Sequence, residues 1–118
     1  KMIQLTDAIL DEHYAHLIER PFFNRIKTSM KAQPVIVMCL AGIDAVQVVR
    51  TMTGVTNGRN AAPGTIRGDF SMSGQENIIH TSDSVENAKI ELDRFFKPEE
   101  IFEYTPITMS QLYASDEV

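Results

Sequence analysis

The chain has 118 residues, a mass of 13.3 kDa and a formal net charge of −5, with 43% hydrophobic and 23% charged residues. The length is below the ~150 residues of a typical domain and the composition is globular, so we expect one domain with a modest core, not a disordered or two-domain chain. No apolar run approaches the ~20 residues of a membrane helix, and no signal-peptide layout is present. The acidic balance does not suit stable nucleic-acid binding or a membrane surface. We therefore expect a soluble, cytoplasmic protein.

The first third of the chain predicts a strand and two helices. Residues 1–5 are short and apolar, as in a strand, and Thr6-Asp7 caps a helix that we expect over residues 7–19. Pro21 suits the first turn of a second short helix. The apolar side chains of that helix are Phe22, Phe23, Ile26 and Met30.

A buried strand, a helix and a long loop are predicted next. The unbroken apolar run 34–40 indicates a strand buried on both faces, and Cys39 within it is expected to be a buried thiol in a reducing compartment, with no intrachain disulfide. A helix follows, capped at Asp44 and ending at Gly54. From residue 55 to 76 the apolar period vanishes among glycines, and loops of this length are usually functional.

The last third predicts a strand at 77–80, a helix capped by Ser84, and an extended tail over 98–118. The helix has the clearest amphipathic pattern of the chain, and Lys97-Pro98 ends it. Its apolar side chains are Val85, Ala88, Leu92, Phe95 and Phe96. Strands separated by helices indicate a layered α/β or α+β domain.

A basic segment stands out in this acidic chain. Residues 45–68 contain no Asp or Glu but hold Arg50, Arg59 and Arg67. Guanidinium groups suit bidentate contacts with phosphate oxygens, so this segment is where we expect an anionic ligand. Thr56, Asn57 and Asn77 could add neutral donors. The alternative is a set of ordinary surface arginines.

His80 is the strongest candidate for a nucleophile. It ends an apolar segment and is followed at once by hydroxyl and carboxylate residues. Glu91 lies at the margin of the next helix's apolar face, where it could accept a hydrogen bond from one imidazole nitrogen and leave the other as nucleophile. The alternative is a core-edge histidine with an ordinary hydrogen bond. For His13 and His16, a solvated helix face is favoured over a zinc site, because structural zinc needs four ligands.

Several motifs together resemble those of the nucleoside diphosphate kinases, in order and spacing, over residues 1–104. The octapeptide Asn77-Ile78-Ile79-His80-Thr81-Ser82-Asp83-Ser84 looks like the family's active-site signature. The other matching stretches are His13-Tyr14 with Arg20-Pro21-Phe22-Phe23, Gly54-Val55-Thr56-Asn57, and Pro63-Gly64-Thr65-Ile66-Arg67-Gly68-Asp69-Phe70.

The resemblance implies a kinase that moves the terminal phosphate of a nucleoside triphosphate such as ATP to a nucleoside diphosphate, in a ping-pong cycle through a phosphohistidine on His80. It implies that Glu91 and Ser82 orient that histidine and that Tyr14 lies close to it. The residues that it assigns to phosphates or sugar hydroxyl are Arg50, Thr56, Arg67 and Asn77, and those assigned to the base are Phe22 and Ile26.

Cofactor, assembly and fold are also implied. Magnesium would arrive with the nucleotide phosphates, without a protein metal site, and the protein would be a tetrameric or hexameric homo-oligomer. The fold would be α+β, with a ferredoxin-like antiparallel sheet flanked by helices. Residues 1–118 would form one such domain, with 55–76 as its nucleotide-binding loop and 98–118 as its tail.

The sequence also departs from the family pattern. Thr81 stands where a glycine is usual, and Val55 and Gly58-Arg59 differ from the commoner loop residues. The family's first strand and helix, with a lysine that contacts the transferred phosphate, have no counterpart, and we expect an N-terminally incomplete domain. Two competing hypotheses are a catalytically silent nucleotide-binding or scaffolding relative, and a generic interaction module.

Overall fold

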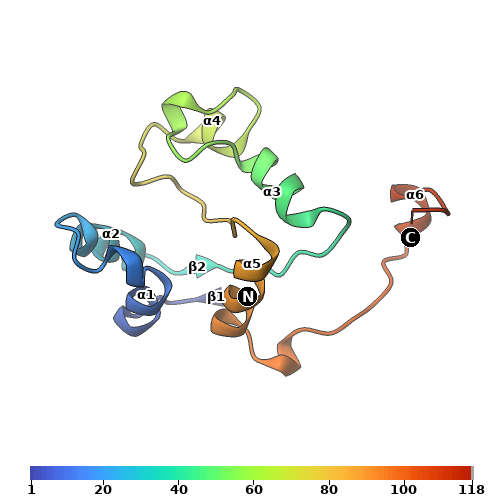
Figure 1. The fold of residues 1–118 in the computed structure, drawn as a ribbon, viewed down its shortest axis with the longest axis horizontal. Coiled ribbons are helices and arrows are strands. Elements are labelled where there is room, and N and C mark those ends of the chain that lie inside the picture. Colours follow the sequence, from blue (N-terminus) through green and yellow to red (C-terminus); the bar gives the residue numbers. More distant parts are fainter. Residues whose placement is uncertain (118) are drawn as a thin grey trace.

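A short antiparallel ribbon and several helices organise residues 1–117, which are the residues described by the structure, a computed structural model (Figure 1). The ribbon pairs Met2 with Ile36 and Ile3 with Val35. The elements in chain order are β1 (Met2–Ile3), α1 (Asp7–His13), η1 (Ala15–Leu17), α2 (Phe23–Lys31), β2 (Val35–Ile36), α3 (Ala45–Thr53), η2 (Gly58–Asn60), α4 (Ile66–Phe70), α5 (Val85–Phe95), η3 (Pro98–Glu100) and α6 (Met109–Leu112).

Ion pairs join α1 to α2, and each helix has one buried apolar residue. Leu10 and Phe23 are only 1% and 3% exposed. The ammonium of Lys27 lies 2.6 Å from a carboxylate oxygen of Asp11 and 3.1 Å from one of Asp7, and it sits over the ring of Phe23. The two helices therefore form a hairpin whose geometry positions the segment between them.

The first predicted helix is confirmed at its start but is shorter than expected. The hydroxyl of Thr6 accepts a hydrogen bond from the Ile9 backbone N–H, which caps α1 as predicted. The helix ends at His13 instead of residue 19, because Tyr14 has φ −112° and ψ 33° and leaves the helical region. The second helix begins at Phe23, after the proline that we expected in its first turn.

The predictions for residues 34–40 are wrong in two respects. Only Val35–Ile36 form a strand, and the exposed fractions of Ile36, Met38 and Leu40 are 67%, 64% and 56%. Cys39 is also exposed, not buried. The physical reason is that β2 has only two residues, which pair with β1 alone within residues 1–117, and no other element covers the apolar side chains of this segment.

The region from residue 45 to 76 combines one predicted helix with two that the sequence did not reveal. α3 ends at Gly54, which has φ 78°, as expected. Asp44 stands at its N-terminus with φ 51°, but its side chain makes no capping hydrogen bond. The expected loop contains η2 and α4, which are too short to produce an apolar period.

Residues 77–80 are irregular, so the strand predicted there is wrong. Ile78 has φ 61°, which takes the backbone out of the extended region. The helix that follows is confirmed, because the hydroxyl of Ser84 accepts from the Asn87 N–H and α5 ends before Lys97. Over residues 98–117 the predicted tail is extended apart from η3 and α6 (Figure 1), and residue 118 lies outside the described residues. No helix within residues 1–117 is long and apolar enough to cross a membrane.

Glycine is required in the middle of α4, at Gly68. A Cβ added at Gly68 would lie 2.0 Å from the carbonyl oxygen of Ala62, a backbone atom that cannot turn away. We expect Gly68→Ala to lower the free energy of unfolding by about 1–3 kcal/mol, through overpacking. Urea denaturation of the two proteins measures this difference.

The matched control is Gly74→Ala, because a Cβ there meets nothing closer than 3.7 Å. We expect it to leave the stability unchanged or raised by up to about 1 kcal/mol, since alanine reduces the freedom of the unfolded chain. Equal stability of the two variants would contradict the close approach at Gly68.

Candidate active site

Three predicted residues meet where α5 passes the segment that precedes it. The Nε2 atom of His80 lies 3.0 Å from Oε2 of Glu91, and the hydroxyl of Ser82 donates to the same carboxylate oxygen. The side chain of His80 is 43% exposed, whereas that of Glu91 is 19% exposed. The structure thus joins an accessible imidazole to a half-buried carboxylate.

The charge state of Glu91 sets the tautomer of His80. Burial alone would raise the pKa of this carboxyl, but the hydrogen bonds from Ser82 and His80 outweigh burial, and the pKa lies below its usual value. Glu91 is therefore ionised at neutral pH and can only accept, so the ring proton of neutral His80 is on Nε2. The lone pair of Nδ1 is then available to attack an electrophile.

His13 is the residue whose contribution sequence reasoning missed. Its ring centroid lies 4.5 Å from that of His80, at an interplanar angle of 83°. It is half-buried, so the solvated face expected for it is wrong, whereas His16 is exposed. His13 lies three positions after Leu10, the buried residue of α1, and this spacing on one helix face was the available signal.

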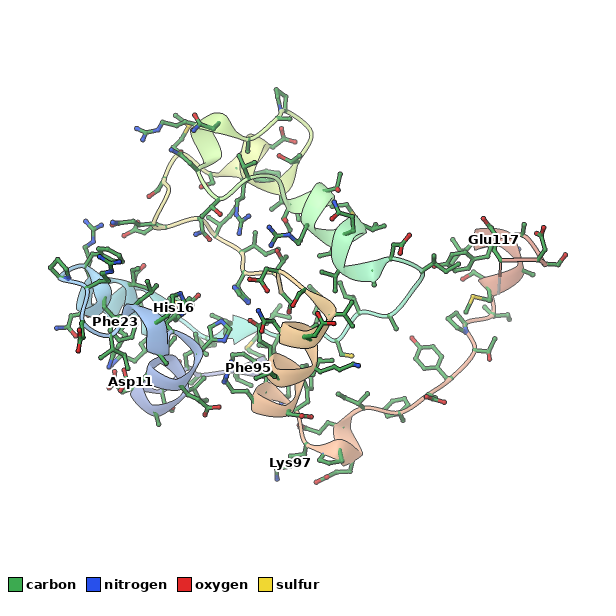
Figure 2. The ribbon with its side chains drawn as sticks, viewed as in Figure 1. Asp11, His16, Phe23, Phe95, Lys97 and Glu117 are labelled. Atoms are coloured by element: carbon green, nitrogen blue, oxygen red, sulfur yellow. The ribbon has the colours of Figure 1, made fainter. Side chains whose placement is uncertain are left out.

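Two aromatic rings complete the surroundings of His13. Tyr14 packs edge-on against His13, with 4.5 Å between the ring centroids. The distance between the ring centroids of Tyr14 and His80 is 6.5 Å. Burial raises the pKa of its phenol, which stays protonated. Phe95, on α5, contacts His13 with 5.4 Å between the ring centroids, and Figure 2 shows its position on that helix. Tyr14 thus lies close to His80, as the sequence predicts.

Arg67 occupies a structural position within the site. It is 7% exposed, and its guanidinium donates to the carbonyl oxygens of Gly54, Asn77 and Ile79. These three hydrogen bonds, which we call the Arg67 clamp, join the end of α3 to the segment before His80. A guanidinium has five N–H donors, so two of them remain for another acceptor.

The other predicted phosphate-binding residues lie around this clamp. Arg50 is exposed near the end of α3, and its charge acts on both Arg67 and Asp83. Thr56 is exposed in the next segment, while Asn77 is half-buried and uses its backbone carbonyl to accept from Arg67. The structure therefore places two guanidinium groups near the signature segment.

The residues predicted to contact a base lie on the α1–α2 hairpin. Phe22 precedes α2 and Ile26 is one turn later, joined by a backbone hydrogen bond of 3.2 Å. Both are half-buried, whereas Phe23 between them, which Figure 2 labels, is buried. They share one side of the hairpin and form an apolar pair separate from the histidines.

One group in the described residues has the composition of a metal site. His13, His80 and Glu91 offer ligand atoms that all lie within 4.8 Å of one another. Mg²⁺ prefers oxygen ligands in octahedral geometry, and this set supplies two imidazoles and one carboxylate, so it does not suit magnesium. In addition, Nδ1 of His13 already accepts a hydrogen bond from Arg94.

An oriented imidazole beside two guanidinium groups and a glycine-rich segment has the components of a phosphotransferase site. Comparison with known proteins is more specific. A family model described as "Nucleoside diphosphate kinase" matches residues 1–101. The nucleoside diphosphate kinase of Parabacteroides distasonis is 66% identical over 117 residues, which are 99% of this chain and 76% of that protein. Human nucleoside diphosphate kinase A is 42% identical over 113 residues, covering 96% of this chain and 74% of that protein.

Solved structures agree with these matches. The Halobacterium salinarum nucleoside diphosphate kinase, in complex with CDP, has a TM-score of 0.90 at 32% identity, and the one from Encephalitozoon cuniculi has 0.88 at 35%. Each alignment covers 96% of this chain and 76% of the other. The chain belongs to the nucleoside diphosphate kinase family and is a phosphotransferase. The predicted α+β, ferredoxin-like fold class is confirmed.

The Arg67 clamp predicts a loss of stability that is independent of any nucleotide. We expect Arg67→Gln to lower the free energy of unfolding by about 1–3 kcal/mol, because buried carbonyl groups lose a charged donor. Arg59→Gln is the matched control, since Arg59 is an exposed arginine of the same basic segment. Urea unfolding without nucleotide compares them, and equal stabilities would contradict the clamp.

Proposed function

We propose that this nucleoside diphosphate kinase works through a phosphohistidine on His80, in a ping-pong cycle with ATP as one donor. The observation that carries the proposal is the hydrogen bond between Nε2 of His80 and the ionised Glu91, which leaves Nδ1 with its lone pair on an exposed edge. One site would serve both half-reactions, because each uses the same atom.

The chemistry balances without an additional base. In the first half-reaction, Nδ1 attacks the terminal phosphorus of the triphosphate, the N–P bond forms, and the bond to the bridging oxygen breaks as the diphosphate leaves. The proton stays on Nε2 of His80, hydrogen-bonded to Glu91, and the negative charge of Glu91 offsets the positive charge of the phosphorylated ring. In the second half-reaction, a terminal oxygen of another diphosphate attacks phosphorus and the lone pair returns to Nδ1.

Residues of the basic segment are suited to hold the phosphates. Arg50 is exposed, and Arg67 retains two N–H donors beyond its clamp, so both could bind phosphoryl oxygens. Thr56 and Asn77 would add neutral donors to the phosphates or the sugar. In this proposal residues 55–76 form the nucleotide-binding loop, and its function is electrostatic positioning of the transferred group.

The protein would bind the base with little specificity and would provide no dedicated site for the metal ion. Phe22 and Ile26 would contact the base through apolar surface, which any base can satisfy, and Tyr14 would support the histidine pair. Magnesium would enter as part of the nucleotide substrate, since the residues around His80 lack the oxygen ligands of a protein magnesium site. It would neutralise phosphate charge during transfer.

Assembly and location are proposed from the family resemblance. We expect a homo-oligomer, tetrameric or hexameric, in the cytoplasm. The exposed thiol of Cys39 fits a reducing compartment. The alternative, a catalytically silent relative, requires nucleotide binding without formation of a phosphoenzyme, and the next experiment separates the two.

The nucleophile is tested by labelling. Incubating the chain with γ-labelled ATP and Mg²⁺ should give a phosphoprotein that is labile in acid and stable in base, as expected for phosphohistidine, and that passes its label to a second nucleoside diphosphate. His80→Ala should abolish the label, whereas His16→Ala, at an exposed histidine, should retain it. Saturable nucleotide binding by calorimetry without labelling would support the silent relative instead.

The orientation of His80 is tested through Glu91. We expect Glu91→Gln to slow the labelling of His80 by about a hundredfold or more, because the amide has no charge and can donate to Nε2, which moves the ring proton to Nδ1. Glu86→Gln, at an exposed carboxylate of the same helix, is the control. Single-turnover labelling with urea unfolding distinguishes the effect from loss of the fold, and an unchanged rate would exclude this role for Glu91.

A further inference from the structure

Arg94 links α5 to the histidine pair, and neither the family assignment nor the proposed chemistry uses it. Its Nη1 lies 2.9 Å from Nδ1 of His13, and its Nε donates to Oε1 of Glu12 at 3.0 Å. The side chain of Arg94 is 12% exposed, whereas that of Glu12 is 66% exposed. The guanidinium therefore lies between an exposed carboxylate and a half-buried imidazole, both on α1.

The donor character of arginine decides which nitrogen of His13 carries the proton. A guanidinium is always charged and has no acceptor, so Nδ1 must accept with its lone pair. A neutral imidazole has one N–H, which is then on Nε2. A protonated His13 would direct a second N–H at Arg94 and lose this bond.

The surroundings of His13 favour this neutral form. Its pKa is lowered to about 4, first by burial and then by the charge of His80, with smaller contributions from Arg94 and His16, while Glu91 opposes them. His13 thus remains neutral at pH 7 and does not compete with His80 as a charged donor to Glu91.

His80 needs such a neighbour because its own hydrogen bond leaves its ring plane undetermined. The bond to Glu91 fixes the position of Nε2, but rotation about the N···O direction would still move Nδ1. The ring that packs against His80 most closely is that of His13, edge-on at 4.5 Å between centroids. The orientation of His13 therefore limits the direction in which Nδ1 of His80 points.

We propose that Arg94 is a positioning residue for phosphoryl transfer: it holds His13 in the Nε2–H tautomer and, through the edge-on contact, fixes the ring plane of His80. The inference rests on the proposed function, in which His80 is the phosphorylated group. Arg94 itself touches neither substrate nor the attacking atom. Its effect should consequently appear in the rate of transfer and not in the affinity for nucleotide.

Arg94→Met tests this assignment, because methionine keeps an unbranched stem and removes the donors. In the full chain we expect single-turnover labelling of His80 to slow about tenfold, with the nucleotide concentration for half-maximal rate unchanged, since misplacement of a reacting atom by 1 Å can cost ~10²-fold. Arg94→Lys retains a donor and should recover part of the rate. Lys89→Met, at an exposed lysine of the same helix, should match the unaltered chain.

Two measurements separate positioning from a structural effect. Imidazole ¹⁵N shifts should show the Nε2–H tautomer of His13 in the unaltered chain and a mixture of tautomers in Arg94→Met. In a His13→Gln background, Arg94→Met should cause no further loss of rate, because residues that act through one contact are not additive. Additive losses, an unchanged tautomer or an unchanged rate would each overturn the proposal. Absence of labelling in the unaltered chain would contradict the proposed function instead, and the nitrogen shifts would still decide the tautomer.

Discussion

The guanidinium of Arg67 holds together the two segments from which the active site is built. It donates to Gly54 at the end of α3, and to Asn77 and Ile79 in the segment that leads to His80. Between the last two carbonyls lies Ile78 with φ 61°, a conformation that a β-branched residue adopts only where its surroundings impose it. The placement of His80 therefore depends on the buried guanidinium of Arg67. This cation holds residues 77–80 in an irregular conformation instead of the expected strand.

α5 completes the site by presenting two polar side chains from one face. Glu91 and Arg94 are three residues apart, so they lie on the same side of the helix. Glu91 bonds to His80, and Arg94 bonds to His13 on α1. A single helix thus orients both imidazoles, one through an acceptor and one through a donor. In the proposed mechanism, this arrangement leaves His80 as the nucleophile, and its neighbour His13 is neutral at pH 7.

Two of the three arginines in the basic segment 45–68 have different structural positions. Arg50 is exposed, while Arg67 is nearly buried in backbone contacts. Burial, and then the charge of Arg50, lower the pKa of Arg67, so the two cations are close enough to repel. An anion bound between them would relieve that repulsion, which agrees with the proposal that this segment binds phosphates.

Local patterns in the sequence determined the features that depend on a few neighbouring residues. The caps at Thr6 and Ser84 and the end of α3 at Gly54 could all be predicted, because each is decided within about one helical turn. The pairing of His80 with Glu91 could also be predicted from the sequence, because only residues 81–84 and the first part of α5 separate them. Residues 34–40 could not be predicted in this way, because their exposure depends on which elements cover them.

Only the tertiary structure decided which distant groups share the site. His13 and Arg94 are 81 positions apart and meet because α1 packs beside α5. Arg67 looked like a free phosphate ligand in the sequence, yet three of its donors are used by backbone carbonyls. The sequence by itself thus determined the family and singled out His80 as the proposed nucleophile, whereas the fold determined how that histidine is held. The physical reason is that hydrogen bonds between remote segments depend on packing, which no local pattern encodes.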